Sequence, residues 1–185
     1  MKYFEWWGEL DSIEVRFSDR QFNGFWFVEG SPVVGWAEFI IAVYLCDDIP
    51  RFDFGIARNG WPIFSERMRD FLNGQCPGLV QFLPFRLQRP DGSAQTGRYS
   101  VGQVLRLVDC LDKERTKIRE SWAPINEFGD FAVLRPLVLS SKIIGDHQLF
   151  RIKGHSGSVV IREDLKDAIE AAGFGLQRFD DIEVQ

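Results

Sequence analysis

The sequence predicts an α+β fold built mainly on antiparallel sheet, with few helices and two related strand–helix–strand units. The first observation is a repeat: residues 60–72, GWPIFSERMRDFL, return without a gap ninety-seven residues later as residues 157–169, GSVVIREDLKDAI. The second is a series of short apolar segments between turn residues, which is typical of strands. The period is too long for a solenoid array, whose repeats span roughly 20–50 residues. An internal duplication within an α+β fold is therefore expected.

Each copy of the repeat is expected to hold one amphipathic helix. Apolar residues recur at offsets of four, seven and eight, which fit a 3.6-residue period. Ser65 is placed to cap the first helix, and the second helix has acids in its first turn instead. We expect the first helix to end at Gly74 and the second near Gly173. The expected buried faces are Phe64, Met68, Phe71 and Leu72 in the first copy, and Ile161, Leu165, Ala168 and Ile169 in the second.

The remaining elements are expected to be strands and loops. Segments rich in β-branched and aromatic residues predict strands, and clusters of Asp, Pro, Gly and Ser predict loops. Pro84 places its strand at a sheet edge or a bulge. The expected strands are residues 2–7, 13–17, 21–28 (within a hairpin), 32–36, 38–45, 79–87, 99–110, 131–134, 137–140 and 148–152, and the expected loops are 47–50, 89–97 and 153–158.

The chain is long enough to bury a substantial core as one domain. We expect a single α+β domain over residues 1–185, and a division into a β-rich segment, 1–40, and a core, 41–185, is the alternative. The three cysteines are widely spaced and form no Cys-x-x-Cys pair, which indicates a reducing compartment. Acids interrupt the N-terminal apolar run, and the longest apolar stretch, residues 39–46, is too short to span a bilayer. A cytoplasmic location is therefore expected.

The charge distribution bears on the kind of partner. A net charge of −5 disfavours nucleic-acid binding, which needs clustered Lys and Arg. Residues 1–60 carry ten acids against five bases, whereas residues 61–145 carry nine acids against twelve bases. The acidic N-terminal third is either a solvated face or a surface that steers a basic protein partner.

No pattern of residues predicts catalysis, a metal site or a cofactor. Residues 154–158, GHSGS, differ from the G-x-S-x-G elbow of hydrolases, because a glycine follows Ser156 directly. His147 and His155 have no Cys or His nearby at metal-ligand spacing. Cys110 lies between carboxylates and is expected to be a buried structural thiol. We therefore expect no enzyme, and a small cytosolic hydrolase or transferase with a site built from scattered residues is the alternative.

Five segments in fixed order carry a family resemblance. They are PIFSERMRDFL, VQFLPFRL, VLRLVDCLDKERT, LVLSSKIIGDHQLFRIKG and VVIREDLKDAIEAAGFGLQRF. In this combination the chain resembles immunity family eleven of the bacterial polymorphic-toxin immunity proteins, formerly a domain of unknown function. The resemblance covers roughly residues 40–182 and departs at residues 161–163, Ile-Arg-Glu, where the family more often has Val-Ser-Glu. That departure affects a helix cap.

The resemblance implies a non-catalytic protein that binds and neutralises a cognate toxin, often a nuclease, in the cell that produces it. The expected partner is this toxin, with no nucleic acid, no membrane and no cofactor. No catalytic residues are implied. The N-terminal third lies largely outside the repeat and concentrates negative charge, so we expect the toxin contacts there. The candidate contact residues are Asp11, Glu14, Asp19, Trp26, Asp47 and Asp48.

Overall fold

The computed structural model confirms the α+β class. It describes residues 1–10, 13–16, 30–36, 41–44, 52–57, 61–89, 91–93, 98–118, 133, 135–175 and 177–185. Within these ranges the fold has three helices and three sheets whose strand pairs are mostly antiparallel. The predicted hairpin around residues 21–28 and the predicted loop 47–50 lie outside the described residues.

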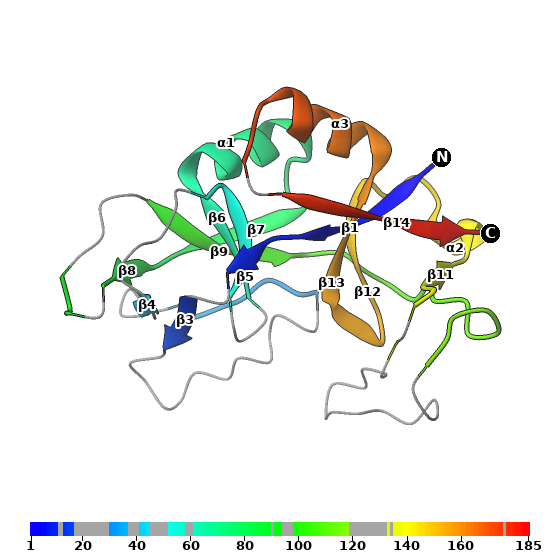
Figure 1. Ribbon diagram of the computed structural model, residues 1–185, viewed down its shortest axis with the longest axis horizontal. Helices are drawn as coiled ribbons and strands as arrows, with labels where there is room; N and C mark the ends of the chain where they lie inside the picture. The colour runs from blue at the N-terminus through cyan, green and yellow to red at the C-terminus, as the bar shows by residue number, and fades with distance from the viewer. Residues whose placement is uncertain are drawn as a thin grey trace.

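Two larger sheets and one small sheet make up the fold (Figure 1). The six-stranded sheet has the order β10 (Leu107–Val108), β12 (Leu149–Ile152), β13 (His155–Arg162), β1 (Tyr3–Trp7), β14 (Arg178–Val184) and β11 (Val138–Leu139). The five-stranded sheet has the order β2 (Glu9–Leu10), β5 (Phe54–Ala57), β6 (Pro62–Ser65), β9 (Tyr99–Val104) and β7 (Val80–Pro84). The three-stranded sheet has the order β3 (Ile13–Arg16), β4 (Ile41–Tyr44) and β8 (Arg86–Gln88).

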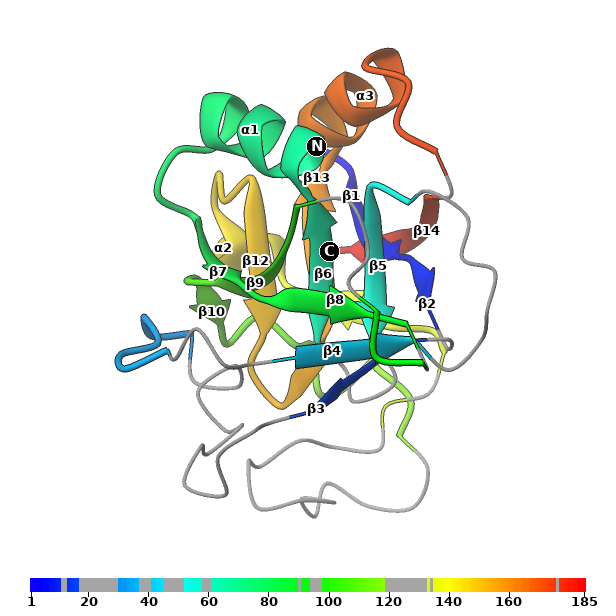
Figure 2. The ribbon, with the colours of Figure 1, turned by 90° about the vertical axis from the view of Figure 1, so that its left-hand side faces the viewer.

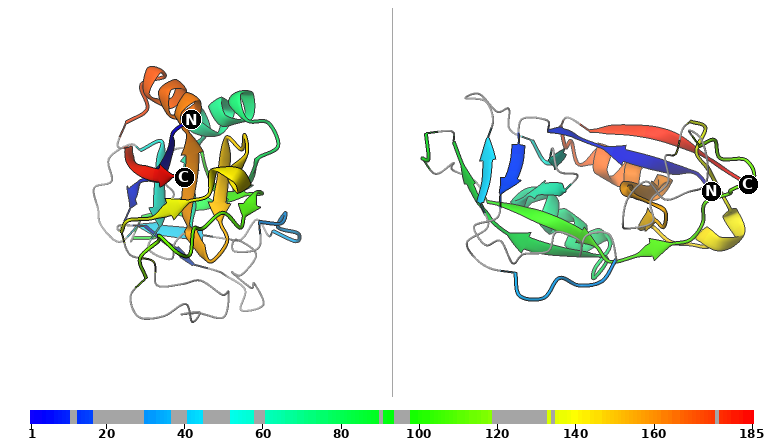
Figure 3. Two further views of the ribbon diagram at one scale, coloured as in Figure 1. Left: turned by 90° about the vertical axis from the view of Figure 1, so that its right-hand side faces the viewer. Right: turned by 90° about the horizontal axis from the view of Figure 1, so that it is seen from below.

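The helices occupy two places. The longer ones, α1 (Glu66–Gln75) and α3 (Glu163–Ala171), lie side by side on one side of the larger sheets, away from β3, β4 and β8 (Figures 1 and 2). The single turn α2 (Ser141–Ile144) was not predicted and lies beside the chain ends, where the amide of Ser141 donates to the carbonyl of Gln185 at 2.7 Å. The two termini lie close together, as Figure 3 shows.

The predicted repeat extends over the whole topology. In both β6–α1–β7 and β13–α3–β14 the two strands are parallel, and one antiparallel strand lies between them. On the outer side of β6, β5 pairs antiparallel with β6 and β2 pairs parallel with β5. In the same way, β12 pairs antiparallel with β13 and β10 pairs parallel with β12. Ile41 pairs with Arg86, and ninety-seven residues later Val138 pairs with Glu183. Within the described residues, the strands of the two halves therefore follow the same order and directions.

The two halves exchange their first strands. β1 comes from the first half but lies between β13 and β14, and β9 comes from the second half but lies between β6 and β7 (Figure 1). The register gives the equivalent positions, since Trp6 pairs with Phe179 and Gly102 pairs with Phe82, ninety-seven residues earlier. Trp6 and Gly102 thus occupy the same place in the two sheets.

One apolar core joins the larger sheets to the two long helices. Trp6 stacks on Phe54 with the ring centroids 4.0 Å apart and packs edge-on against Phe64 at 5.9 Å. A Cβ at Gly102 would come within 2.2 Å of the Phe64 ring, so a residue without a side chain is needed there. Of the predicted helix faces, Met68, Leu72, Leu165 and Ile169 are confirmed as buried helix residues, and Phe71 and Ala168 are partly buried. Phe64 and Ile161 are buried as well, but they lie in β6 and β13 and not in the helices.

The predicted cap of α1 is confirmed, whereas its predicted end is wrong. Ser65 Oγ accepts a hydrogen bond from the amide of Met68 at 3.1 Å and donates to Asp53 Oδ1 at 2.8 Å. The helix continues through Gly74 because Cys76 is buried and its amide donates to the Leu72 carbonyl at 2.8 Å. α3 has no side-chain cap and is followed by Gly173 with φ of 66°, as predicted.

Four strand and loop predictions need correction. The predicted strand 32–36 is absent, because Gly35 adopts a positive φ and turns the backbone. The predicted loop 153–158 is only a two-residue turn with Gly154 at φ of 82°, and β13 already begins at His155. The predicted strand 79–87 is divided into β7, which is an edge strand, and β8. The predicted strand 99–110 is likewise divided into β9 and β10.

Candidate functional site

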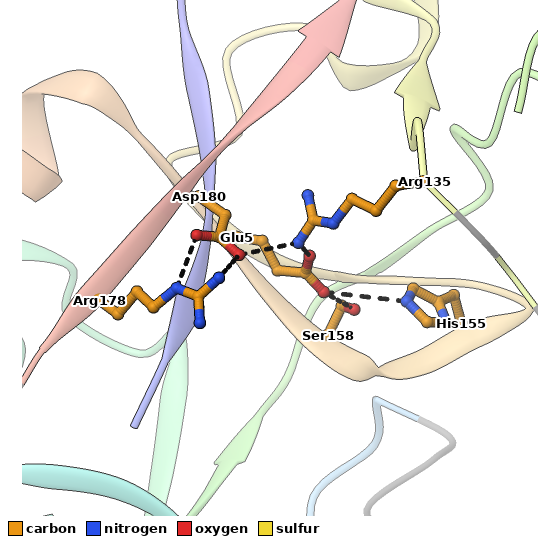
Figure 4. Close-up of polar contacts among 6 residues, drawn as sticks. All are labelled: Glu5, Arg135, His155, Ser158, Arg178 and Asp180. Carbon is orange, nitrogen blue, oxygen red and sulfur yellow. Dashed lines mark hydrogen bonds and ion pairs between the residues drawn. The ribbon is translucent and has the colours of Figure 1, made fainter. Parts of the chain in front are cut away.

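A buried carboxylate is the starting point for the candidate site (Figure 4). Glu5 lies in the middle of β1 and is only 2% exposed. Its Oε1 accepts a hydrogen bond from the hydroxyl of Ser158, and its Oε2 accepts one from Arg135 Nη2 at 2.6 Å. The Nε2 atom of His155 lies 3.8 Å from the same Oε1. Such partners are required, because burial of an unpaired carboxylate is costly.

Asp180 continues this network to the protein surface. Its Oδ2 lies 3.0 Å from Arg135 Nη2 and 3.0 Å from Arg178 Nη2, and its Oδ1 lies 2.8 Å from Arg178 Nε. The side chains of Arg135 and Arg178 are 50% and 67% exposed. Two guanidinium groups are therefore held at the surface by carboxylates that lie deeper. We name the six residues of Figure 4 the Glu5 cluster: Glu5, Arg135, His155, Ser158, Arg178 and Asp180.

The strand exchange assembles this cluster. β1 pairs with β13 on one side and β14 on the other, so that Glu5 lies opposite Val160 and Asp180. Successive residues of a strand point to opposite faces of the sheet. Phe4 and Trp6 point toward α3, so Glu5, which lies between them, points to the face away from α3. Arg135 precedes β11, which pairs with the end of β14.

The equivalent place in the first half of the chain is apolar. By register, Val101 of β9 corresponds to Glu5, because Val101 lies between Ile63 and Leu83 as Glu5 lies between Val160 and Asp180. Trp61 corresponds in the same way to Ser158. The first-half residues are buried together in one apolar cluster that contains Trp61, Ile63, Leu83 and Val101.

This contrast shows that the sheet can form with apolar residues at the positions of the Glu5 cluster. The same backbone arrangement buries apolar side chains in one half and an ionic network in the other. Replacing a buried ion pair with well-packed apolar residues is often neutral or stabilising, by about 1–4 kcal/mol. Stability of the sheet alone therefore does not account for the Glu5 cluster.

An open hollow of about 560 Å³ adjoins the cluster through Arg135. Among the described residues, the Nε and Nη1 atoms of Arg135 have no hydrogen-bond partner, since its contacts with Glu5 and Asp180 both use Nη2. Asp181 and Glu183 have no cationic partner within the same described part of the chain. The lining residues are Arg135, Pro136, Leu137, Asp181, Ile182 and Glu183.

The cluster contains a serine, a histidine and a carboxylate, but not in the arrangement of a hydrolase. In a catalytic triad the histidine accepts the serine proton and the carboxylate orients the histidine. Here the hydroxyl of Ser158 donates directly to Glu5, and Arg135 binds the other oxygen of that carboxylate. Ser158 is also only 1% exposed, so a substrate carbonyl has no path to it.

The described thiols are not suited to nucleophilic chemistry. Burial raises the pKa of Cys110 to about 12 and that of Cys76 to about 11, so both stay protonated at neutral pH. The prediction of a buried Cys110 is confirmed. His147 packs near Phe150, with ring centroids 6.3 Å apart, and is not part of the Glu5 cluster.

Two further findings concern metals and membranes. In the part of the chain that the structure describes, no three or more His, Cys, Asp or Glu side chains gather in a way that could hold a metal ion. None of the helices within those residues is long and apolar enough to cross a membrane.

The toxin contacts predicted from sequence remain a prediction. Asp11, Asp19, Trp26, Asp47 and Asp48 lie outside the described residues. The remaining candidate, Glu14, lies in β3, where it pairs with Val43.

The sequence reasoning did not find the Glu5 cluster. Glu5 is separated from Arg135 by 130 residues and from Ser158 by 153, so no local spacing connects them. The one available signal was a charged residue in the middle of the apolar strand YFEWW.

In a comparison with protein-family models, residues 36–184 match the model described as the immunity protein family (Imm11). The chain belongs to this immunity protein family. The match confirms the resemblance predicted from sequence and includes both copies of the repeated helix. All of the Glu5 cluster except Glu5 itself lies within the matched residues. No curated protein matches the chain.

Proposed function

We propose that this protein is a non-catalytic immunity protein that binds a cognate bacterial toxin and neutralises it in the cytoplasm of the producing cell. The observation that carries this proposal is the Imm11 family match over residues 36–184. An immunity protein acts on a partner protein, and neutralisation by binding requires a complementary surface and no reaction of its own.

The charge of the chain supports a basic toxin. The net charge is −5, and a toxin that acts on nucleic acid presents a basic surface to its substrate. Opposite charges accelerate the association of two proteins and suppress wrong partners. We therefore propose a nuclease as the toxin, and a protein surface, not a nucleic acid or a membrane, as the partner.

A hydrolase or transferase is the second candidate, because Glu5, His155 and Ser158 lie together (Figure 4). The hydrogen bond from Ser158 to Glu5 and the burial of Ser158 both weigh against it. The two candidate functions predict different molar amounts of this protein for protection of the cell from the toxin. A binding protein must match its toxin in number, whereas an enzyme would inactivate many toxin molecules.

Co-expression with the toxin encoded beside this gene tests the proposed function. The toxin domain alone is expected to stop growth, and co-expression of this protein should restore growth and yield a complex that survives gel filtration. A catalytically inactive toxin domain serves as the binding control. Undiminished toxicity, with no complex formed by either toxin domain, would contradict the proposal.

A further inference from the structure

We propose that the exposed side of the Glu5 cluster binds an aspartate or glutamate side chain of the toxin. Arg135 would donate hydrogen bonds to that carboxylate, and Glu5 and Asp180 would act as positioning residues that hold Arg135 in place. This inference rests on the proposed function and adds the surface and the chemistry of one contact. We name Arg135, Arg178 and Trp7 the arginine surface.

The Glu5 cluster has its carboxylates inside and its cations outside. Glu5 is almost fully buried, and Asp180 is partly buried. At least half of the side chain is exposed in both Arg135 and Arg178. A partner that approaches this face of the sheet therefore meets guanidinium groups first (Figure 4). The protein group that best complements a guanidinium is a carboxylate, which forms charge-assisted hydrogen bonds with it.

Arg135 is held in place before a partner arrives. Its Nη2 lies 2.6 Å from Glu5 Oε2 and 3.0 Å from Asp180 Oδ2, and these contacts restrict the planar guanidinium group. Both contacts use Nη2, so the N–H groups of Nε and Nη1, which have no acceptor among the described residues, remain for a partner. A donor that is ordered in advance loses less conformational entropy on binding.

The two carboxylates beneath Arg135 are already compensated. Arg178 binds Asp180 with both ends of its fork, since Nε lies 2.8 Å from Oδ1 and Nη2 lies 3.0 Å from Oδ2. Glu5 likewise has both oxygens occupied, one by the hydroxyl of Ser158 and one by Arg135. Repulsion of a further carboxylate by these acids is therefore reduced, and Arg178 is required for that reduction at Asp180.

Trp7 adds an apolar group to the arginine surface. It pairs with Arg178 across β1 and β14, and residues opposite each other in a sheet point to the same face. Trp7 is partly exposed and belongs to none of the apolar clusters formed by the described residues. Tryptophan and arginine are enriched among the residues that dominate protein–protein binding. Their occurrence together on one face favours a protein partner.

The equivalent face of the first half makes an internal contact instead. By register, Gln81 occupies the place of Arg178. Its side chain accepts a hydrogen bond from the amide of Val33 at 2.7 Å and donates one to the carbonyl of Val33 at 3.0 Å. Val33 itself is buried in the apolar cluster of that half. The first half therefore covers this face with its own chain, whereas the second half keeps Arg135 and Arg178 at least half exposed.

Three single variants test the inference, with the inactivated toxin domain encoded beside the gene as the probe in calorimetric titrations. Arg135→Lys keeps a cation for Glu5 but lacks the planar set of donors, and it should weaken binding by about tenfold or more. Arg178→Gln should weaken binding by about threefold or more, because Asp180 would then repel the toxin carboxylate. The control is Arg98→Gln, since Arg98 lies just before β9 in the other sheet and is 82% exposed. It should leave the affinity within about twofold.

The direction of the changes separates a local contact from general attraction. Loss of a positive charge from a protein with a net charge of −5 should strengthen long-range attraction to a basic toxin. Weaker binding by Arg178→Gln, with unchanged or stronger binding by Arg98→Gln, therefore requires a contact at the arginine surface. Unchanged or stronger binding by both Arg135→Lys and Arg178→Gln would overturn the inference alone. Absence of binding by the unaltered protein would overturn the proposed function and the inference with it.

A double-mutant cycle tests the carboxylate itself. Each exposed Asp or Glu of the toxin domain is replaced by Asn or Gln and titrated against the unaltered protein and Arg135→Lys. One acid should cost about tenfold in affinity with the unaltered protein and less than about twofold with Arg135→Lys. Equal losses with both proteins for every acid would overturn the carboxylate contact. Unfolding temperatures within about 2 °C of the unaltered protein exclude an effect on folding, and Arg178→Gln decides alone if Arg135→Lys falls outside that range.

Discussion

Replacement of Arg135 by alanine is expected to lower the free energy of unfolding by about 3 kcal/mol. The side chain of Glu5 is only 3% exposed, so it cannot turn to water when its cation is removed. Breaking a buried pair in this way typically costs about 3–5 kcal/mol, and the lower end applies because Arg135 itself is half exposed. Ser158 would still donate to Glu5, and Asp180 would keep Arg178.

The matched variant replaces the carboxylates and the serine with apolar residues. In Glu5→Val, Ser158→Ala, Asp180→Leu, the first and third changes introduce the residues found at the equivalent places in the first half, Val101 and Leu83. No buried carboxylate is left without a cation, and Arg135 can turn to solvent. We therefore expect this triple variant to lose less than about 1 kcal/mol, although it removes more polar contacts than the single change.

Urea unfolding followed by tryptophan fluorescence measures both changes, since the chain has six tryptophans. For a chain of this length about 3 kcal/mol corresponds to a fall in unfolding temperature of roughly 6–12 °C. A triple variant as unstable as Arg135→Ala would refute the reasoning. In that case the Glu5 cluster would be a requirement of the fold, and its retention would no longer indicate binding.

Three further predictions concern the fold. Gly102→Ala should lower stability by about 2 kcal/mol or more in the same urea assay, because the new Cβ would lie 2.2 Å from the Phe64 ring, and an unchanged midpoint would contradict this packing. Cys110, whose pKa burial raises to about 12, should stay unmodified by maleimide at pH 8 in the folded protein and react in urea, as peptide mass spectrometry would show; rapid native labelling would disprove its burial. We also propose that residues 1–185 form one domain, so residues 1–96 and 97–185 should fold only when mixed, and cooperative unfolding of either fragment alone would contradict this.

The repeated unit could be predicted because its signals are local. The helix of the first copy follows from Ser65 and from the apolar residues spaced at three and four, and its cap is formed as expected. The same pattern ninety-seven residues later predicts the second helix without a cap residue. Periodicity and capping depend on neighbours in sequence, which is why these elements were found.

The exchange of β1 and β9 could not be predicted, because the two strands carry different side chains at equivalent positions, each suited to its own neighbours in the core. Trp6 and Gly102 occupy equivalent places, but Trp6 fills the shared core and Gly102 makes room for Phe64. A comparison of side chains therefore does not align β1 with β9. The backbone pairing that makes them equivalent is a property of the folded sheets.

The Glu5 cluster was missed for a related reason. In the sequence, Glu5 is one of several acids that interrupt the N-terminal apolar run, and nothing local distinguishes it from the others. Its partners come from β13, β14 and the segment before β11, which the sequence does not connect to it. The predicted loop over residues 153–158 also concealed that Ser158 lies inside a buried strand.

Titration of toxin activity against this protein tests the central claim most directly. A fixed amount of the toxin domain encoded beside the gene is mixed with increasing amounts of the protein, and the remaining toxin activity is measured after short and long incubation. Neutralisation by binding predicts a linear fall that ends at a fixed molar ratio and does not change with time. Inactivation of excess toxin by a small amount of protein, increasing with time, would contradict the account, as would full toxin activity at every ratio.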